Sequence, residues 1–264
     1  MKYTYSELAK MIDHSLLHPT MTDHELEDGC KLAAKYMVAS VCIKPYAVKR
    51  AAELLRGTGV LVGAVIGFPH GNSTTESKRY EAELACRDGA AEIDMVINIG
   101  KALSGDWDYV ECDVSAVCDE AHRHGAKVKV IFENDYLTKG GAGLSSDDFK
   151  RKLCQLCERA GADWVKTSSG YGFVKQPDGS YNYKGATEDD LALMRASVSA
   201  KVQVKAAGGV RDLDGLIKVR DLGGSRCGAT ATAAMMDDYR RREAAEQAGQ
   251  IADANTGAIG GGGY

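Results

Sequence analysis

Two lysines and one aspartate stand inside short apolar segments that otherwise have the composition of buried β-strands. Lys166 lies in residues 164–170, Lys205 in residues 203–209 and Asp94 in residues 92–98. Each segment is rich in apolar or β-branched residues and ends in glycine or a polar turn, which is typical of a strand. A charged, unpaired lysine in such a strand costs several kcal/mol, because its ammonium group loses its hydration. We therefore interpret the three residues as a reactive amine and the neighbours that tune it.

The chemistry expected of such a site starts from a neutral amine. A lysine surrounded by other cations in a partly dry site has a lowered pKa, so its amine can attack a carbonyl at neutral pH and form a Schiff base. Asp94 and the second lysine can transfer the protons that imine formation and enamine chemistry require. The predicted reaction class is the imine-based making or breaking of a carbon–carbon bond.

These residues are positioned by a regular alternation of strand-like and helical segments. The expected strands cover residues 12–17, 39–44, 60–67, 92–98, 127–133, 164–170, 203–209 and 225–231. The expected helices cover residues 23–35, 46–56, 75–88, 107–124, 146–160, 188–197, 213–222 and 232–247. Such alternation predicts parallel strands joined by right-handed crossovers, and eight units close into a barrel. The expected fold is therefore α/β, a single (β/α)8 TIM barrel over residues 1–250.

Strand alternation also predicts which side chains face the barrel interior. In residues 92–98 apolar positions alternate with Asp94, so the apolar set faces the helices and Asp94 faces inward. The same reasoning turns Lys129 and Glu133 inward from residues 127–133, and Lys166 and Lys205 inward from their own strands. The alternative is a buried ion-pair network that only stabilises the fold. It is less favoured, because an interior with three cations and few carboxylates is poorly compensated.

Two glycine-rich segments suggest a phosphate site. Gly208 and Gly209 follow the seventh expected strand, and residues 228–230 lie on the eighth strand where it leads into a helix. Loops at these two positions of a barrel, with free backbone N–H groups near a helix N-terminus, commonly bind phosphate. The alternative is a pair of glycine turns without a ligand.

Length, charge and cysteine content exclude several classes of function. The chain has 264 residues, is 44% hydrophobic and carries a formal net charge of −4, with scattered lysines and arginines. We therefore expect no nucleic-acid surface and no polybasic membrane patch. The first residues contain no apolar signal segment and no stretch is apolar enough to span a bilayer, so we expect a cytoplasmic protein. Eight cysteines indicate reduced thiols in such a chain, and the spread of the histidines predicts no metal site.

The last residues differ in composition from the rest. Residues 251–264 include a run of four glycines followed by Tyr264, and this segment cannot bury enough apolar surface to offset the entropy of ordering it. We expect a flexible tail. Its terminal ring and phenol suggest a tethered lid or proton relay, and the alternative is a disordered end of no consequence.

Taken together, the motifs of this chain resemble the deoxyribose-phosphate aldolases, in order, from about residue 8 to residue 240. The most specific are Lys-Thr-Ser-Ser-Gly at residues 166–170 and Lys-Ala-Ala-Gly-Gly at residues 205–209. Others are Asp-His-Ser-Leu-Leu at residues 13–17, Val-Cys-Ile at residues 41–43 and Gly-Phe-Pro at residues 67–69.

The resemblance implies cleavage of a phosphosugar, 2-deoxy-D-ribose 5-phosphate, to acetaldehyde and D-glyceraldehyde 3-phosphate without a metal or organic cofactor. It implies Lys166 as the Schiff-base nucleophile, Lys205 as the neighbour that lowers its pKa and handles protons, and Asp94 as proton donor and acceptor. The positions that match the family's phosphate cradle are Gly170, Gly208, Gly209, Gly228 and Thr230. The supporting positions are Lys129, Asp13, Ser15, Cys42 and Tyr264. The sequence does not determine the oligomeric state of the protein, and a homodimer is one possible assembly.

The sequence departs from commoner members of this family in two places. Tyr171 follows Gly170 where many members have a lysine, and Ala231 stands where many have a second serine. One fewer cation near the phosphate would leave its binding to backbone amides and Thr230. The longer loop between residues 172 and 187 contains Lys175 and Lys184, which are candidates for the missing charge.

Three rival functions remain at this point. Another Schiff-base barrel, such as a transaldolase or a lysine-class fructose-bisphosphate aldolase, would share the mechanism but not this arrangement of lysines and Asp94. A metal-dependent aldolase would need histidines clustered at strand ends. A phosphosugar-binding regulator without activity would have no reason to bury Lys166 and Lys205 together.

Overall fold

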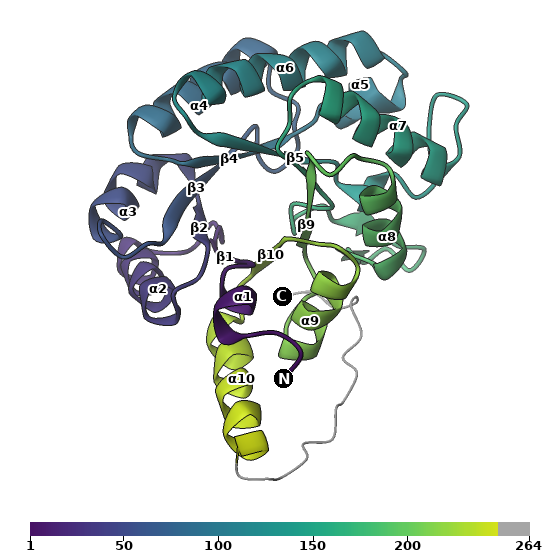
Figure 1. The fold of residues 1–264 in the computed structure, drawn as a ribbon. Helices are drawn as coiled ribbons and strands as arrows, with labels where there is room; N and C mark the ends of the chain where they lie inside the picture. Colours follow the sequence, from purple (N-terminus) through teal and green to yellow (C-terminus); the bar gives the residue numbers. More distant parts are fainter. Residues whose placement is uncertain (248–264) are drawn as a thin grey trace.

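A computed structural model describes residues 1–247 of the chain, and its centre is a closed barrel of eight parallel strands (Figure 1). Around the barrel the strands follow the order β1, β2, β3, β4, β5, β6, β9, β10, and β10 pairs with β1 to close it. The strands are β1 (Ile12–Leu16), β2 (Ser40–Ile43), β3 (Leu61–Ile66), β4 (Glu92–Val96), β5 (Lys127–Ile131), β6 (Trp164–Lys166), β9 (Gln203–Ala207) and β10 (Arg226–Ala229). The predicted TIM barrel is confirmed.

Helices surround the barrel, and every predicted helix has a counterpart. These helices are α2 (Asp23–Tyr36), α3 (Val48–Leu54), α4 (Thr75–Arg87), α6 (Trp107–Arg123), α7 (Ser146–Arg159), α8 (Glu188–Ala196), α9 (Leu213–Asp221) and α10 (Thr232–Gln247). Two short helices were not predicted: α1 (Tyr5–Ala9), which contacts α10, and α5 (Ile99–Leu103). Single 3₁₀ turns cover Pro45–Ala47 (η1) and Asn134–Tyr136 (η2). No helix among residues 1–247 is long and apolar enough to cross a membrane.

Local sequence signals explain where the helices begin. Thr22 precedes α2, and its side chain accepts a hydrogen bond from the backbone N–H of Glu25, whose carboxylate accepts one from the backbone N–H of Thr22. This reciprocal pair satisfies two N–H groups that the helix itself leaves unpaired. Ser145 and Thr187 similarly cap α7 and α8. These cap residues thus set the points at which the chain turns into α2, α7 and α8.

The hydrophobic core lies between the strands and the helices. The outward-facing residues of β4, β5, β6 and β9 are inaccessible to solvent, among them Ile93, Val130, Val165 and Val204. These are the positions that alternation assigned to the helical layer. The opposite face of each strand is therefore turned into the barrel, where the charged residues lie.

The strands end earlier than predicted, and after β5 and β9 the chain takes left-handed conformations. Gly208 and Gly209 have φ angles of 80° and 83°, and Glu133 has a φ angle of 58°. Glu133 therefore does not project from β5 toward Asp94 and Lys129, as alternation predicted. Its buried carboxylate instead accepts hydrogen bonds from the backbone N–H of Ser169 and bonds the Ser169 hydroxyl. The prediction of an inward Glu133 was wrong.

The connection between β6 and α8 contains a hairpin that the sequence pattern did not reveal. Its two short strands, β7 (Val174–Lys175) and β8 (Tyr181–Asn182), pair antiparallel to each other and stand apart from the barrel. The predicted tail, residues 251–264, lies outside the described residues, so the boundary at residue 250 stays a prediction.

Candidate active site

Seven charged side chains from six strands meet inside the barrel. They are Asp13 from β1, Glu92 and Asp94 from β4, Lys129 from β5, Lys166 from β6, Lys205 from β9 and Arg226 from β10. Six are buried with at most 2% of the residue exposed, and the Arg226 side chain is 13% exposed. Asp94 and all three predicted lysines are thus brought together, as strand alternation predicted.

Asp94 is the point at which the lysines meet. Its Oδ2 lies 2.6 Å from Lys166 Nζ and 2.7 Å from Lys205 Nζ, and its Oδ1 lies 3.0 Å from Lys129 Nζ. The Cys42 thiol also donates to Oδ2 over 3.8 Å. One carboxylate therefore bridges the two lysines that the sequence singled out.

Asp13 holds the other side of this network. Its Oδ2 lies 2.6 Å from Lys205 Nζ and 3.4 Å from Lys129 Nζ. Its Oδ1 accepts hydrogen bonds from the Arg226 guanidinium over 2.6 Å and from the Ser40 hydroxyl over 2.8 Å. Within the described part of the chain, Lys205 is consequently paired with two carboxylates, whereas Lys166 is paired with one.

Glu92 and Arg226 complete the network, and sequence reasoning missed both. The Arg226 guanidinium lies 2.6 Å from Glu92 Oε1, and Glu92 also pairs with Lys129. A signal was available for each: Glu92 shares its strand parity with Asp94, and Arg226 alternates with the buried Cys227. The expectation of few carboxylates was wrong, since three carboxylates face four cations here.

The charge count of this network distinguishes Lys166 from the other cations. With all seven groups ionised, the four cations and three carboxylates leave one excess positive charge, and loss of one proton would balance them. Burial lowers the pKa of Lys166, and the charge of Lys205 lowers it further against the opposing effect of Asp94. Burial also acts against a charged Lys205, but Asp13 and Asp94 outweigh it and hold the pKa of Lys205 well above its usual range. Lys166 is the amine that deprotonates more readily.

Asp94, Asp13 and Lys129 keep their charges, because each faces groups of opposite sign. Burial alone would raise the pKa of Asp94, but Lys129, Lys166 and Lys205 together hold it well below its usual range. The pKa of Asp13 is likewise lowered, by Lys129, Lys205 and Arg226 against the effect of burial. The pKa of Lys129 is raised, because Asp13 and Asp94 outweigh its burial.

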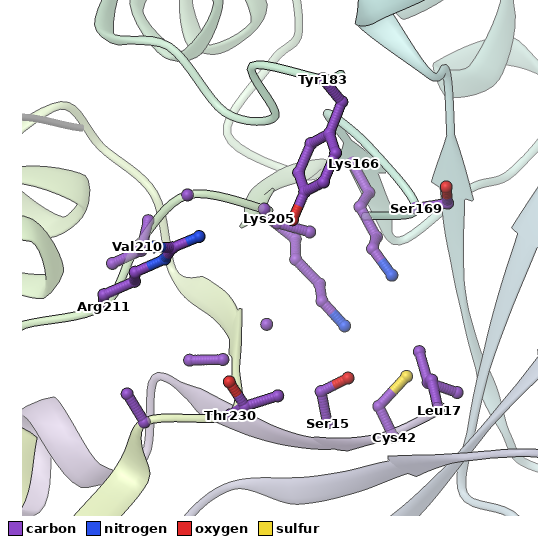
Figure 2. Close-up of a pocket in the computed structure, with 16 residues that line it drawn as sticks. Ser15, Leu17, Cys42, Lys166, Ser169, Tyr183, Lys205, Val210, Arg211 and Thr230 are labelled. Atoms are coloured by element: carbon purple, nitrogen blue, oxygen red, sulfur yellow. The ribbon is translucent and has the colours of Figure 1, made fainter. Parts of the chain in front are cut away.

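A pocket of about 320 Å³ opens above this network at the carboxyl ends of the strands. Lys166 and Lys205 reach its wall, and Figure 2 shows their amines directed into it near Ser15 and Cys42. The pocket is not lined by Asp94, Asp13 or Lys129. Asp94 and Asp13 lie behind the two lysines and form ion pairs with them. Amines exposed to a pocket above a buried carboxylate are arranged to attack a carbonyl compound and exchange protons with it.

The far wall of the pocket is formed by the two glycine-rich loops. Gly208, Gly209, Gly228 and Thr230 line it, in agreement with their predicted position. Arg211 lines the same wall and brings a cation that the prediction did not include (Figure 2). This wall offers backbone N–H groups, a hydroxyl and a guanidinium, which is the chemistry that binds a phosphate group.

Three other predicted residues lie differently from the expectation. Gly170 is buried with a φ angle of 85° but does not line the pocket, where its neighbour Ser169 does. Lys175 and Lys184 are exposed and do not line it either, whereas Arg211 does. Tyr264 lies outside the described residues.

An apolar region adjoins the reactive amines. The Tyr171 ring packs edge-on against Phe68 with a centroid separation of 5.5 Å, and both contact the buried Leu17, Cys42 and Val65. Tyr171 therefore fills space beside the site with an aromatic ring. Among residues 1–247, no group of three or more His, Cys, Asp or Glu side chains is arranged to hold a metal ion.

A closed barrel with buried lysines at a pocket at the carboxyl ends of its strands suits an enzyme that forms a Schiff base with a carbonyl substrate. A family model described as DeoC/LacD family aldolase matches residues 8–233. The chain belongs to this family.

Known relatives are similar along nearly their whole length. The chain is 51% identical over 240 residues to the deoxyribose-phosphate aldolase of Rhodopirellula baltica, covering 91% of this chain and 92% of that protein. It is 42% identical over 231 residues to the deoxyribose-phosphate aldolase of Aciduliprofundum boonei, covering 88% and 96%. Among solved structures, the tetrameric deoxyribose phosphate aldolase from Aeropyrum pernix superposes with a TM-score of 0.76 at 27% identity, covering 90% of this chain and 92% of that one. An aldolase called QR15 superposes with a TM-score of 0.78 at 31% identity, covering 90% and 98%.

Proposed function

We propose that this protein reversibly cleaves 2-deoxy-D-ribose 5-phosphate to D-glyceraldehyde 3-phosphate and acetaldehyde, with Lys166 as the Schiff-base nucleophile. The observation that carries the proposal is the difference between the two pocket lysines. Among residues 1–247, Lys205 is paired with both Asp13 and Asp94, whereas Lys166 is paired with Asp94 alone and has a lowered pKa. A nucleophilic amine has to be neutral, and Lys166 is the lysine whose surroundings favour that state.

The reaction follows from attack of Lys166 Nζ on the aldehyde carbon, C1, of the open-chain sugar. The carbinolamine loses water to give an iminium ion, which withdraws electrons from the C2–C3 bond. As the C3 hydroxyl gives up its proton, that bond breaks, D-glyceraldehyde 3-phosphate leaves, and the electron pair forms an enamine on Lys166. Protonation of the enamine at C2 followed by hydrolysis releases acetaldehyde and regenerates the amine.

Asp94 and Lys205 are proposed to carry the protons of these steps. Asp94 Oδ2 bonds both amines, so a proton released at one amine has a path through the carboxylate to the other. The strongly held positive charge of Lys205 lowers the pKa of Lys166 and lies where it can donate to a hydroxyl leaving C1. Lys129 is proposed to support these residues, because it pairs with both Asp13 and Asp94.

The phosphate of the sugar is proposed to bind at the glycine-rich wall. Gly208 and Gly209 present their backbone there in a conformation that other residues rarely adopt, and Gly228 and Thr230 lead into the N-terminus of α10. Arg211 adds a charge that complements phosphate. From the family resemblance, Gly170 belongs to this cradle by shaping the loop that follows β6.

The setting of the enzyme is proposed to be the cytoplasm. All eight cysteines are unpaired, as expected for a reducing compartment. The assembly is proposed to be a homodimer, and light scattering coupled to size-exclusion chromatography tests it by giving the mass of the particle in solution.

The test of the function is chemical trapping with acetaldehyde and borohydride, read out by peptide mass. Reduction of the Schiff base should add one ethyl group to Lys166, and Lys166→Ala should abolish the adduct. Lys175→Ala is the matched control, because Lys175 is exposed and does not line the pocket. An adduct that persists in Lys166→Ala and maps to Lys205 would reverse the two roles. A phosphosugar-binding regulator would give no adduct and no cleavage.

A further inference from the structure

We propose that Tyr183, which follows the β7–β8 hairpin, binds the three-carbon phosphate portion of the sugar through its phenol hydroxyl and so sets affinity for the phosphorylated substrate. The inference rests on the proposed function and adds to it a substrate-binding residue outside the barrel strands. In the hairpin, Val174 pairs with Asn182 and Lys175 pairs with Tyr181. Tyr183 is the next residue, where the hairpin returns to the barrel.

The returning segment is fixed to the barrel by its backbone. The Asp135 carboxylate accepts hydrogen bonds from the backbone N–H groups of Lys184 over 2.6 Å and Gly185 over 3.0 Å. The N–H of Ala186 donates to the carbonyl oxygens of Ala207 and Gly208, at 3.0 Å and 3.1 Å. These bonds tie the residues after Tyr183 to the end of β9, so the tyrosine is held against the glycine-rich wall.

The Tyr183 ring is enclosed by the loop and by the wall it covers. Only 7% of the residue is exposed, and its ring meets the Phe173 ring edge-on at a centroid separation of 5.4 Å. On its other side it lies over Gly208, where an added Cβ would come within 3.2 Å of a Tyr183 ring carbon. A rotation of the ring is thereby restricted, and its hydroxyl has a defined position.

That position is inside the pocket. Tyr183 lines the pocket together with Lys166, Gly209 and Arg211. Figure 2 shows its hydroxyl directed toward the pocket centre, between Arg211 and the lysine amines in that view.

A sugar bound between Lys166 and the glycine-rich wall must pass this hydroxyl. With C1 joined to Lys166 and the C5 phosphate at residues 208–211, the atoms that face Tyr183 belong to C3–C5. A phenol can donate a hydrogen bond to a phosphate oxygen, or donate to and accept from the C4 hydroxyl. The two-carbon portion that becomes acetaldehyde ends at Lys166 and has no polar atom for Tyr183 to bind.

The test is Tyr183→Phe, which keeps the ring on Gly208 and removes only the hydroxyl. We expect kcat/KM for cleavage of 2-deoxy-D-ribose 5-phosphate to fall about 10-fold, mainly through KM, as loss of one charge-assisted or substrate hydrogen bond predicts. Exchange of the acetaldehyde methyl protons with solvent should be unchanged, because the two-carbon portion on Lys166 has no polar atom for Tyr183 to bind. Tyr181→Phe is the matched control on the same hairpin, with 63% of the residue exposed.

Unphosphorylated 2-deoxyribose distinguishes the atoms involved. If the hydroxyl binds phosphate, the penalty in Tyr183→Phe should disappear with this substrate, and if it binds the C4 hydroxyl, the penalty should persist. Unchanged KM and kcat/KM for the phosphosugar in Tyr183→Phe would overturn the inference, and so would an equal loss of acetaldehyde exchange. A failure of the proposed function is separate, since the wild-type protein would then neither exchange acetaldehyde protons nor cleave the sugar.

Discussion

Replacement of Lys205 by methionine gives the most direct test of how the reactive amine is tuned. Methionine has a similar length and no charge, so the change removes one cation beside Lys166 and leaves the cavity filled. Three cations would then face three carboxylates, and Asp13 would keep its hydrogen bonds from Arg226 and Ser40. The network would be balanced with Lys166 charged, so the variant should fold while its Lys166 holds its proton more tightly.

The size of the effect follows from the shared carboxylate oxygen. Lys166 Nζ and Lys205 Nζ lie 2.6 Å and 2.7 Å from Asp94 Oδ2, which places the two amines close together. At about 5 Å and an effective dielectric constant of about 20, two unit charges repel by about 3 kcal/mol, or about two pKa units. Removal of Lys205 should therefore raise the pKa of Lys166 by about two units. The neutral fraction of the amine at neutral pH should fall accordingly.

The assay is the rate of reductive trapping with acetaldehyde and cyanoborohydride, measured as a function of pH. The acidic limb of the profile should move to higher pH by about two units in Lys205→Met, and the lost rate should return at alkaline pH. Lys205→Arg keeps the charge and should move the limb less. A limb that stays in place or moves to lower pH in Lys205→Met would refute the electrostatic role of Lys205.

Three further predictions concern other parts of the site. Asp94→Asn should lower turnover by about 100-fold or more, because the amide cannot accept a proton, and near-normal turnover would leave Asp94 as a counter-ion only. Gly209→Val should raise KM for the phosphosugar and spare 2-deoxyribose, because a side chain at a φ angle of 83° distorts the glycine-rich wall; equal losses on both would contradict a phosphate site there. Burial raises the pKa of Glu133 to about 7, so the native state holds this proton to higher pH than the unfolded chain and stability should decrease from about pH 4.5 to about pH 7. Glu133→Gln should remove this decrease in the free energy of unfolding, which amounts to at most about 3 kcal/mol. Denaturant titrations at pH 5 and pH 8 measure it, and a parallel change in wild type and variant would contradict the prediction.

The barrel and the centre of the site could be predicted from the sequence because both depend on strand periodicity. A two-residue period assigns each side chain to one face, so Lys166 and Lys205 could be placed inside without knowledge of the helices. The same rule applied to Glu92 would have found a third carboxylate. It failed at Glu133, because alternation holds only while the chain remains in the strand, and no sequence signal marked the left-handed turn at that residue.

The residues that line the pocket from loops were harder to predict. Tyr183 reaches the site through the hairpin and the hydrogen bonds of Asp135, contacts that depend on how two distant loops pack. Arg211 stood in a loop that the sequence identified as a phosphate site, yet nothing in its spacing showed that it would line the pocket wall. Loop conformation is set by tertiary contacts more than by local pattern, and this limits what the sequence can determine.

The distribution of the buried charges divides the barrel into two halves of opposite sign. All three carboxylates come from the first four strands, on β1 and β4, and all four cations come from the last four, on β5, β6, β9 and β10. Neither half can close its own interior without trapping like charges away from water. The two halves should therefore fold only on meeting, drawn together by their complementary interiors.

The opposite charges of the two half-barrels should favour their association with each other. We expect separately expressed fragments, divided in the loop between β4 and β5, to remain unfolded alone and to recover aldolase activity when mixed. Their association rate should fall with added salt, because screening weakens the attraction between the halves. An association rate independent of ionic strength would show that apolar contacts alone join them. The charges that tune the amine would thus also direct the last step of folding.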